Sequence, residues 1–193
     1  MPAGRPRTLD EDTILDAAGR IWWREGVHRV SLNDLASALQ VAKPSLARAF
    51  GGKEAMIGKA LARYGEQARL EIASAITSAE NVGELARRYL EHHVDMQTRA
   101  DAPLGCFIAG ASNECAAVTE GPVREALDQA ASKGRALLLQ RLEAVGAQQP
   151  EQITTFLLAQ TLAMSQMARG GASREELMII VGLAVQAVDH PHC

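Results

Sequence analysis

The stretch from Ser31 to Phe50 constrains the fold more than any other part of the sequence, because it indicates two short helices joined by a tight turn. Its first part, SLNDLASAL, begins with Ser31 and has Asp34 three positions later, a pair that can cap a helix start reciprocally. Its second part, KPSLARAF, has Pro44 in the first turn, where the missing N–H is no loss. A short polar helix supported by an apolar neighbour is the way in which a recognition helix is presented to the DNA major groove.

A longer amphipathic segment precedes this stretch and completes a three-helix unit. It predicts a helix over residues 9–26, with a capping pattern that starts at Thr8 and a glycine at its C-terminal end. Trp22 lies on the apolar face of this helix, so we expect it in the core. Trp23 is one position off that face, and we expect it to be partly exposed.

The rest of the chain also has helical periodicity. Apolar residues make up 47% of the sequence, only 7 residues are Pro, and alternating strand patterns are nearly absent, so the fold class is predicted to be all-α. The helices predicted after the Gly51-Gly52 turn cover residues 54–78, 82–99, 105–117, 122–147, 150–169 and 173–188.

Charge is distributed unevenly along the chain. Residues 1–53 have 8 Lys and Arg against 6 Asp and Glu, and the remaining residues have 12 against 17. This local basic excess is expected if one end of the protein meets a polyanion. Arg5 and Arg7 lie in a Pro- and Gly-rich arm that can reach into a DNA minor groove; the alternative is a solvated tail.

Cysteine content and the lack of certain motifs narrow the functional classes. Cys106, Cys115 and Cys193 are odd in number and lack metal-type spacing, so we expect buried thiols; a redox or electrophile sensor at Cys106 or Cys115 is the alternative. No signal peptide, membrane span, phosphate-binding loop or nucleophile elbow is recognisable. We therefore expect a cytoplasmic protein that is not an enzyme, with no cofactor, no metal centre and no membrane partner.

The last two predicted helices are apolar on more than one side. The run LMIIVGLAVQAV in the final helix is apolar nearly all round, and the helix over residues 150–169 has apolar residues on several faces. A helix with two apolar faces must bury both. We interpret the pair as a homodimer interface; the alternative is a helix buried centrally in a monomer.

In the order and spacing of five segments, the chain resembles the tetracycline-repressor-type (TetR) transcriptional regulators. These segments are GRPR, ILDAAGRIWWREGV, SLNDLASAL, KPSLARAF and GGKEAM. The segment PLGCFIAGASNE is similar to a Gly-Cys segment in one subset of these regulators. The resemblance implies a DNA-binding helix-turn-helix domain over residues 1–53 and a helical effector-binding and dimerisation domain over residues 54–193. It also implies that a homodimer binds a palindromic operator in double-stranded DNA and releases it when a small molecule binds.

The resemblance also implies which residues contact DNA. By position they are Arg5, Arg7, Ser31, Lys43, Ser45, Arg48 and Lys53. Helix-start amides and Lys side chains can hold phosphates, whereas the fork of Arg48 matches the O6 and N7 atoms of guanine.

Three positions depart from the family pattern. Gln40, Ala42 and Ala47 stand where Gly, a capping residue such as Ser, and Tyr are usual. The turn therefore lacks a residue that adopts left-handed geometry easily, and the recognition helix lacks an N-cap. We expect an atypical operator or a modest affinity. The rival hypothesis is a helical protein–protein interaction dimer with a degenerate helix-turn-helix.

Candidate effector contacts share one helical face or lie near it. One face of the helix predicted over residues 82–99 carries Leu85, Tyr89, His92 and Met96. They suggest the wall of a ligand pocket, with apolar residues and a few polar groups, although ordinary core is the alternative for each. The predicted contacts are Tyr89, His92, Met96, Phe107, Asn113, Gln160 and Met164.

Overall fold

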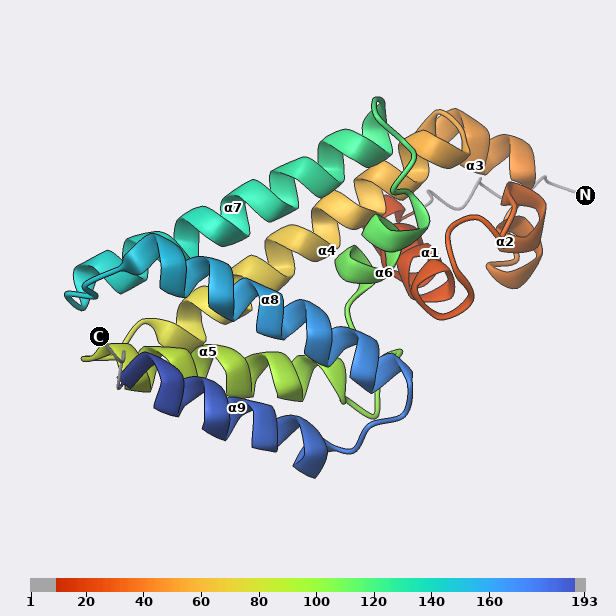
Figure 1. The fold of residues 1–193 in the computed structure, drawn as a ribbon. Helices are drawn as coiled ribbons and strands as arrows, with labels where there is room; N and C mark the ends of the chain where they lie inside the picture. Colours follow the sequence, from red (N-terminus) through yellow and green to blue (C-terminus); the bar gives the residue numbers. More distant parts are fainter. Residues whose placement is uncertain (1–9, 190–193) are drawn as a thin grey trace, which may run out of the picture.

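Helices joined by short loops make up the chain in a computed structural model, which describes residues 10–189 (Figure 1). Over this part of the chain the all-α prediction is confirmed. The helices are α1 (Glu11–Glu25), α2 (Leu32–Ala38), α3 (Lys43–Phe50), α4 (Lys53–Ile76), α5 (Val82–Gln97), α6 (Phe107–Glu114), α7 (Pro122–Ala144), α8 (Pro150–Arg169) and α9 (Arg174–Asp189).

Side-chain caps fix where the first two helices begin. The carboxylate of Asp10 accepts hydrogen bonds from the backbone N–H and the hydroxyl of Thr13, so α1 starts at Glu11 and the predicted cap at Thr8 was wrong. Thr8 itself lies outside the described residues. The capping box predicted for Ser31 and Asp34 is present at the start of α2. These caps satisfy N–H groups that the first turn of a helix leaves unpaired.

Helix α4 connects the end of the molecule formed by α1–α3 to the other helices, and α7 lies along it (Figure 1). At 1.5 Å per residue its 24 residues span about 36 Å. The two helices pack closely because Gly58 faces Pro122, where a Cβ would lie 2.7 Å from a backbone oxygen. Gly65 faces Ala130 in the same way. A rigid pair of helices therefore supports the N-terminal unit.

The core has two hydrophobic clusters. The first contains residues of α1–α4 together with α6 and the start of α7, and the second joins the end of α4 to α5, α7, α8 and α9. Trp22 is buried in the first cluster, as predicted. Trp23 is only 8% exposed, so the prediction of partial exposure was wrong. The reason is long-range packing, because the rings of Tyr64 and Phe107 lie 5.1 and 6.4 Å from its own.

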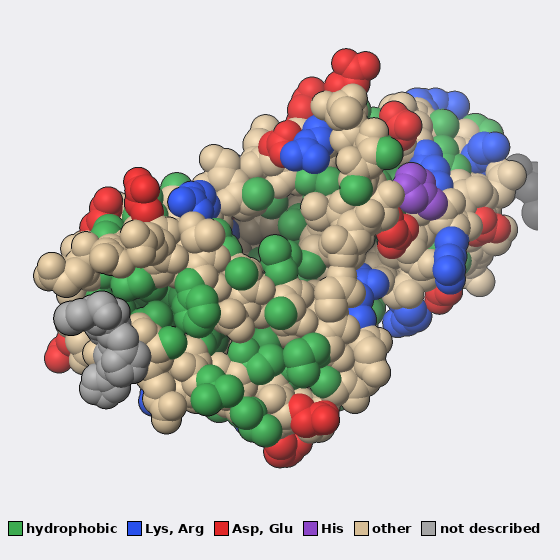
Figure 2. All heavy atoms as spheres, viewed as in Figure 1, with side chains coloured by type: hydrophobic (Ala, Val, Ile, Leu, Met, Phe, Trp, Pro, Cys, Tyr) green, Lys and Arg blue, Asp and Glu red, His purple; other side chains and the backbone are tan. Residues whose placement is uncertain are grey.

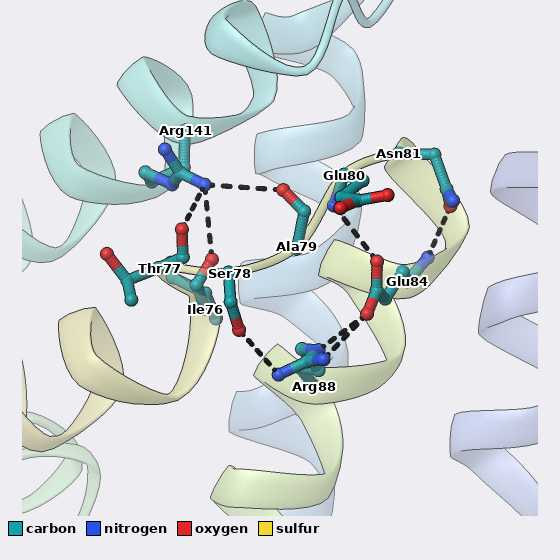
Figure 3. Close-up of polar contacts among 9 residues, drawn as sticks. All are labelled: Ile76, Thr77, Ser78, Ala79, Glu80, Asn81, Glu84, Arg88 and Arg141. Atoms are coloured by element: carbon teal, nitrogen blue, oxygen red, sulfur yellow. Dashed lines mark hydrogen bonds and ion pairs between the residues drawn. The ribbon is translucent and has the colours of Figure 1, made fainter.

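Arginine side chains hold the turn between α4 and α5 (Figure 3). From α7, Nη2 of Arg141 donates to the carbonyl oxygens of Ile76, Thr77 and Ala79. From α5, Arg88 donates to Ser78, and its ion pair with Glu84 completes the network. The last carbonyls of a helix have no partner within the helix, so Arg141 satisfies groups that α4 leaves free. The far end of α4 is thereby fixed against α7.

Several predicted helices end earlier than expected. Helix α6 covers Phe107–Glu114 instead of residues 105–117, because Gly105 has a φ of 77° and Cys115 closes the helix. Helix α5 ends at Gln97 and α7 at Ala144, two and three residues before their predicted ends.

Helices α8 and α9 each bury one apolar face and expose another. Leu157 and Met164 of α8 and Val181 of α9 are fully buried in the second cluster. The exposed apolar residues of the pair, here called the outer face, are Leu162, Met167, Ile179 and Leu183. Figure 2 shows hydrophobic side chains gathered over these two helices. Between residues 10 and 189, the structure contains no helix long and apolar enough to cross a membrane.

Candidate nucleic-acid interface and ligand cavity

Helix α3 is anchored by two residues and presents the others to solvent. Leu46 and Phe50 are buried in the first cluster, whereas Lys43, Ala47 and Arg48 are exposed. Ser45 is half-buried. Lys and Arg side chains are visible at this end of the molecule in Figure 2. The three residues predicted on α3 therefore lie on one short helix, two of them freely accessible to a nucleic acid.

The turn between α2 and α3 contains a left-handed residue although it has no glycine. Gln40 has a φ of 53°, the one positive value among the described residues other than Gly. Ala42 is the N-cap of α3 and provides no side-chain hydrogen bond. A left-handed residue with a Cβ and an uncapped helix each cost free energy, and the backbone hydrogen bonds from Gln40 to Ser37 and from Val41 to Ala36 partly offset that cost.

The remaining predicted DNA contacts lie at two helix starts. The hydroxyl of Ser31 accepts from the N–H of Asp34 and donates to its carboxylate, and these bonds from Ser31 lower the pKa of Asp34. Ser31 is exposed, but its side chain is occupied by the cap. Lys53 begins α4 and donates to the carbonyl of His28. Arg5 and Arg7 lie outside the described residues.

The structure separates most of the predicted effector contacts. Tyr89 and Met164 belong to the second hydrophobic cluster, and burial raises the pKa of the Tyr89 hydroxyl. His92 and Gln160 are half-buried, and Asn113 is exposed on α6. Met96 and Phe107 are the two predicted residues that share a cavity.

This cavity lies between α1, α4 and the segment from α5 to α6, and its volume is about 200 Å³. It is lined by Leu15, Asp16, Gly19, Arg20, Trp23, Ala60, Tyr64, Gln67, Ala68, Glu71, Met96, Arg99, Ala102 and Phe107. The rings of Trp23, Tyr64 and Phe107 contact one another there. Trp23 and Tyr64 were not predicted to line a cavity, because Trp23 was expected to be partly exposed and no pattern in the sequence pointed to Tyr64.

Charged groups surround the cavity and are mostly paired. Arg99 binds the carboxylate of Asp101 through two hydrogen bonds of 3.0 Å, which lower the pKa of that carboxyl, and it lies 3.9 Å from Glu71. Asp16 pairs with Arg63 at 2.6 Å. Arg20 donates to the backbone carbonyl of Asp101. Asp101 therefore joins α1 to the end of α5.

The two described cysteines lie at opposite ends of α6. Cys106 is half-buried; its N–H donates to the hydroxyl of Ser165, and the hydroxyl of Tyr64 lies 3.7 Å from its sulfur. Burial holds the pKa of Tyr64 well above its usual range. Cys115 is buried, and its Sγ lies 3.9 Å from Nε2 of His28.

The exposed helix α3, held by α2 across a tight turn, defines a helix-turn-helix protein. The family model described as "Bacterial regulatory proteins, tetR family" matches residues 14–60. The transcriptional repressor ComR of Escherichia coli K12 is 30% identical over 193 residues, which cover 95% of this chain and 90% of ComR. The repressor BdcR of the same strain is 22% identical, with 96% and 92% of the two chains covered.

A solved structure has the same arrangement of helices. It is that of a cysteine mutant of the TetR family regulator CifR in complex with 26-base-pair operator DNA. Its TM-score is 0.83 at 28% identity, and the match covers 96% of this chain and 100% of that one. The chain belongs to the TetR family. It is a transcriptional regulator of the helix-turn-helix type, as its sequence predicted.

Proposed function

We propose that the protein is a repressor whose dimer binds a palindromic operator and releases it when a small molecule binds. Residues 1–53 form the DNA-binding domain in this proposal, and residues 54–193 form the effector-binding and dimerisation domain. The observation that carries it is the exposure of Lys43 and Arg48 on a helix anchored by Leu46 and Phe50. ComR and BdcR are repressors by name, which favours the same sign of regulation.

The DNA contacts divide into two groups by chemistry. Arg48 reads a guanine edge, with Lys43 and Ser45 beside it on α3. Ser31 and Lys53 stand at the starts of α2 and α4, where backbone N–H groups and a Lys side chain favour phosphates. Arg5 and Arg7 add contacts from the arm.

The outer face of α8 and α9 is the dimer interface in this proposal. Its residues Leu162, Met167, Ile179 and Leu183 are 40–63% exposed in the single chain. A two-fold interface pairs the same patch of both subunits, so the outer face of one subunit covers the outer face of the other. The exposed face of each final helix then becomes buried, as the sequence pattern requires.

The protein acts in the cytoplasm and carries out no catalysis in this proposal. Its effector binds among the residues predicted in the C-terminal part, of which Met96 and Phe107 line the cavity.

DNA binding tests the proposal directly. The purified dimer should bind fragments of its own upstream region with an affinity that falls linearly with salt on a double-logarithmic scale. Arg48→Ala should weaken binding by about 1–3 kcal/mol and relax specificity at one base pair. Lys53→Gln should reduce the salt slope by roughly one. Arg24→Ala provides the matched control, since Arg24 is exposed in the last turn of α1 rather than on α3.

A second function is favoured by one observation, the strained and uncapped turn at Gln40 and Ala42. If the helix-turn-helix is degenerate, the protein is an interaction dimer. An intact dimer that shows no binding to these fragments at low salt would establish this alternative and rule out the repressor.

A further inference from the structure

We propose that the cavity between α1, α4 and α6 binds a compact aromatic carboxylate. The bound molecule contacts both the DNA-binding unit, formed by α1–α3, and the rest of the protein. The inference deepens the proposed function, because it names the class of effector. It rests on that function only for its consequence for operator binding, since ligand binding itself is measured without DNA.

The walls of the cavity select a flat apolar group. The chain has 2 Trp, 2 Tyr and 3 Phe, and three of these seven line this one cavity. Tyr64 meets Trp23 and Phe107 edge to face, with interplanar angles of 71° and 80°. These rings come from α1, α4 and α6. A guest ring would find faces and edges on three sides, the arrangement in which aromatic pairs attract.

The size of the cavity limits the guest to one ring with a short substituent. A volume of about 200 Å³ is somewhat larger than the ~150 Å³ of an engineered apolar cavity that binds benzene. The space exists because small residues line part of the wall, namely Gly19, Ala60, Ala68 and Ala102. A Cβ on Gly19 would lie 3.7 Å from Ala60 and Phe107, an ordinary contact distance.

The charge around the cavity favours an anion. Arg99 is bound by Asp101 and lies near Glu71, and Asp16 is paired with Arg63. Arg20 forms no ion pair among residues 10–189, and its Nη1 donates to a neutral backbone carbonyl. The other donors of its guanidinium remain for a carboxylate, which matches the fork of an arginine. Arg20 is exposed, so the anionic end of the guest would lie at the cavity mouth.

The position of the cavity couples binding to the DNA-binding unit. Leu15, Gly19, Arg20 and Trp23 belong to α1, which packs in the same hydrophobic cluster as α2 and α3. The opposite wall belongs to α4 and to residues 96–107. A carboxylate on the free donors of Arg20 would be held beside the hydrogen bond from Nη1 to the carbonyl of Asp101, so α1 and the end of α5 meet at the bound molecule. The ligand therefore favours one placement of α1 against α4, and a ligand that prefers one arrangement shifts the population toward it.

The adjacent tryptophans allow a direct test. With 5-fluorotryptophan the chain gives two ¹⁹F resonances, which Trp23→Phe assigns. Titration of the full dimer with benzoate should shift the Trp23 resonance saturably and leave that of the fully buried Trp22 nearly unchanged. Benzyl alcohol, which lacks the charge, and cyclohexanecarboxylate, which lacks the aromatic ring, should each bind about 10-fold more weakly.

Matched variants test the two recognition elements separately. Arg20→Gln should weaken benzoate binding about 10-fold without affecting benzyl alcohol, whereas Arg24→Gln, one turn along α1, should leave both unchanged. Gly19→Leu should fill the cavity and abolish binding, whereas Gly134→Leu, at a helical glycine with open space beside it, should not. The Arg20 and Arg24 pair decides the matter even if Gly19→Leu fails to fold.

Two results would overturn the inference. One is an unshifted Trp23 resonance at benzoate concentrations of tens of millimolar. The other is equal binding of benzoate and benzyl alcohol that is insensitive to Arg20→Gln. Neither result bears on operator binding, so the repressor proposal and this one can fail independently.

Discussion

Nη2 of Arg169, the last residue of α8, donates to the backbone carbonyl of Trp23 in α1, 146 residues earlier in the chain, over 3.4 Å. The same nitrogen lies 3.5 Å from the carbonyl of Cys106. The side chain passes Gly105 and Gly110, where a Cβ would meet its atoms. One arginine thus connects α8, which carries part of the outer face, to α1.

A double-mutant cycle should reveal this connection. In the native background Gly110→Ala displaces the guanidinium of Arg169, and the loss of its hydrogen bonds costs about 1 kcal/mol. This cost offsets the stabilisation of roughly 0.5–1 kcal/mol that Ala provides over Gly inside a helix. In an Arg169→Ala background only the gain remains. We therefore expect Gly110→Ala to be more stabilising there by about 1 kcal/mol in urea unfolding. Additive effects of the two substitutions would mean that Arg169 does not depend on the space at Gly110.

The turn before α3 should be improved by a glycine. Gln40→Gly removes the Cβ from a left-handed position, and after the entropy of glycine is counted we expect a gain of roughly 0.5–1 kcal/mol in unfolding free energy. Gln140→Gly, at an exposed position inside α7, should instead destabilise by about 1 kcal/mol. Thermal unfolding of both variants gives the comparison. Equal destabilisation by the two glycines would indicate that the left-handed conformation at Gln40 costs nothing.

Local signals in the sequence were sufficient for the fold but not for the cavity. The Ser31 and Asp34 box, the proline in α3 and the glycine turns each act within a few residues, so they predicted the helix-turn-helix and the order of the helices. Trp23, Tyr64 and Phe107 come together from three helices, and no short-range pattern records that contact.

Asn113 illustrates the same limit. It was predicted as a further candidate for an effector contact, and the structure places it exposed on α6, outside the cavity that Met96 and Phe107 line. The rotation of that short helix is set by distant partners. Arg169 lies against the Gly110 side, and the backbone N–H of His28 donates to Glu114.

A histidine that packs against Tyr89 should make the protein sensitive to acid. Burial, together with neighbouring His92, lowers the pKa of His93 to about 3, and its ring lies 4.6 Å from that of Tyr89. The unfolded chain binds a proton below its ordinary pKa near 6.5, whereas the folded chain stays neutral down to about 3. Stability is therefore full above pH 6.5 and falls as the pH is lowered toward 3, by at most ~1.4 kcal/mol per pH unit.

Urea unfolding between pH 7 and 5 measures this effect before most carboxylates titrate. His93→Phe should flatten the dependence in that range. Phenylalanine has a ring of similar shape but binds no proton in either the folded or the unfolded chain. His92→Gln should flatten it less, since burial lowers the pKa of His92 less far than that of His93. If native protein and His93→Phe lost stability equally between pH 7 and 5, the folded protein would have to accept the proton at His93.

The outer face can be tested with two leucines of similar exposure. Leu183 of α9 is 63% exposed and Leu70 of α4 is 56% exposed, so a glutamate at either position should be tolerated in the single chain. In the dimer, Leu183→Glu buries a carboxylate in an apolar interface, which costs desolvation free energy. Because of the two-fold symmetry, each dimer buries two such carboxylates. We expect its dimer dissociation constant to rise at least about 100-fold by light scattering, with operator binding lost in parallel, because two half-sites are no longer bound together. Leu70→Glu should remain dimeric and bind the operator normally. A dimer of Leu183→Glu with native affinity would place the interface elsewhere, since no apolar contact survives a buried charge at its centre without loss.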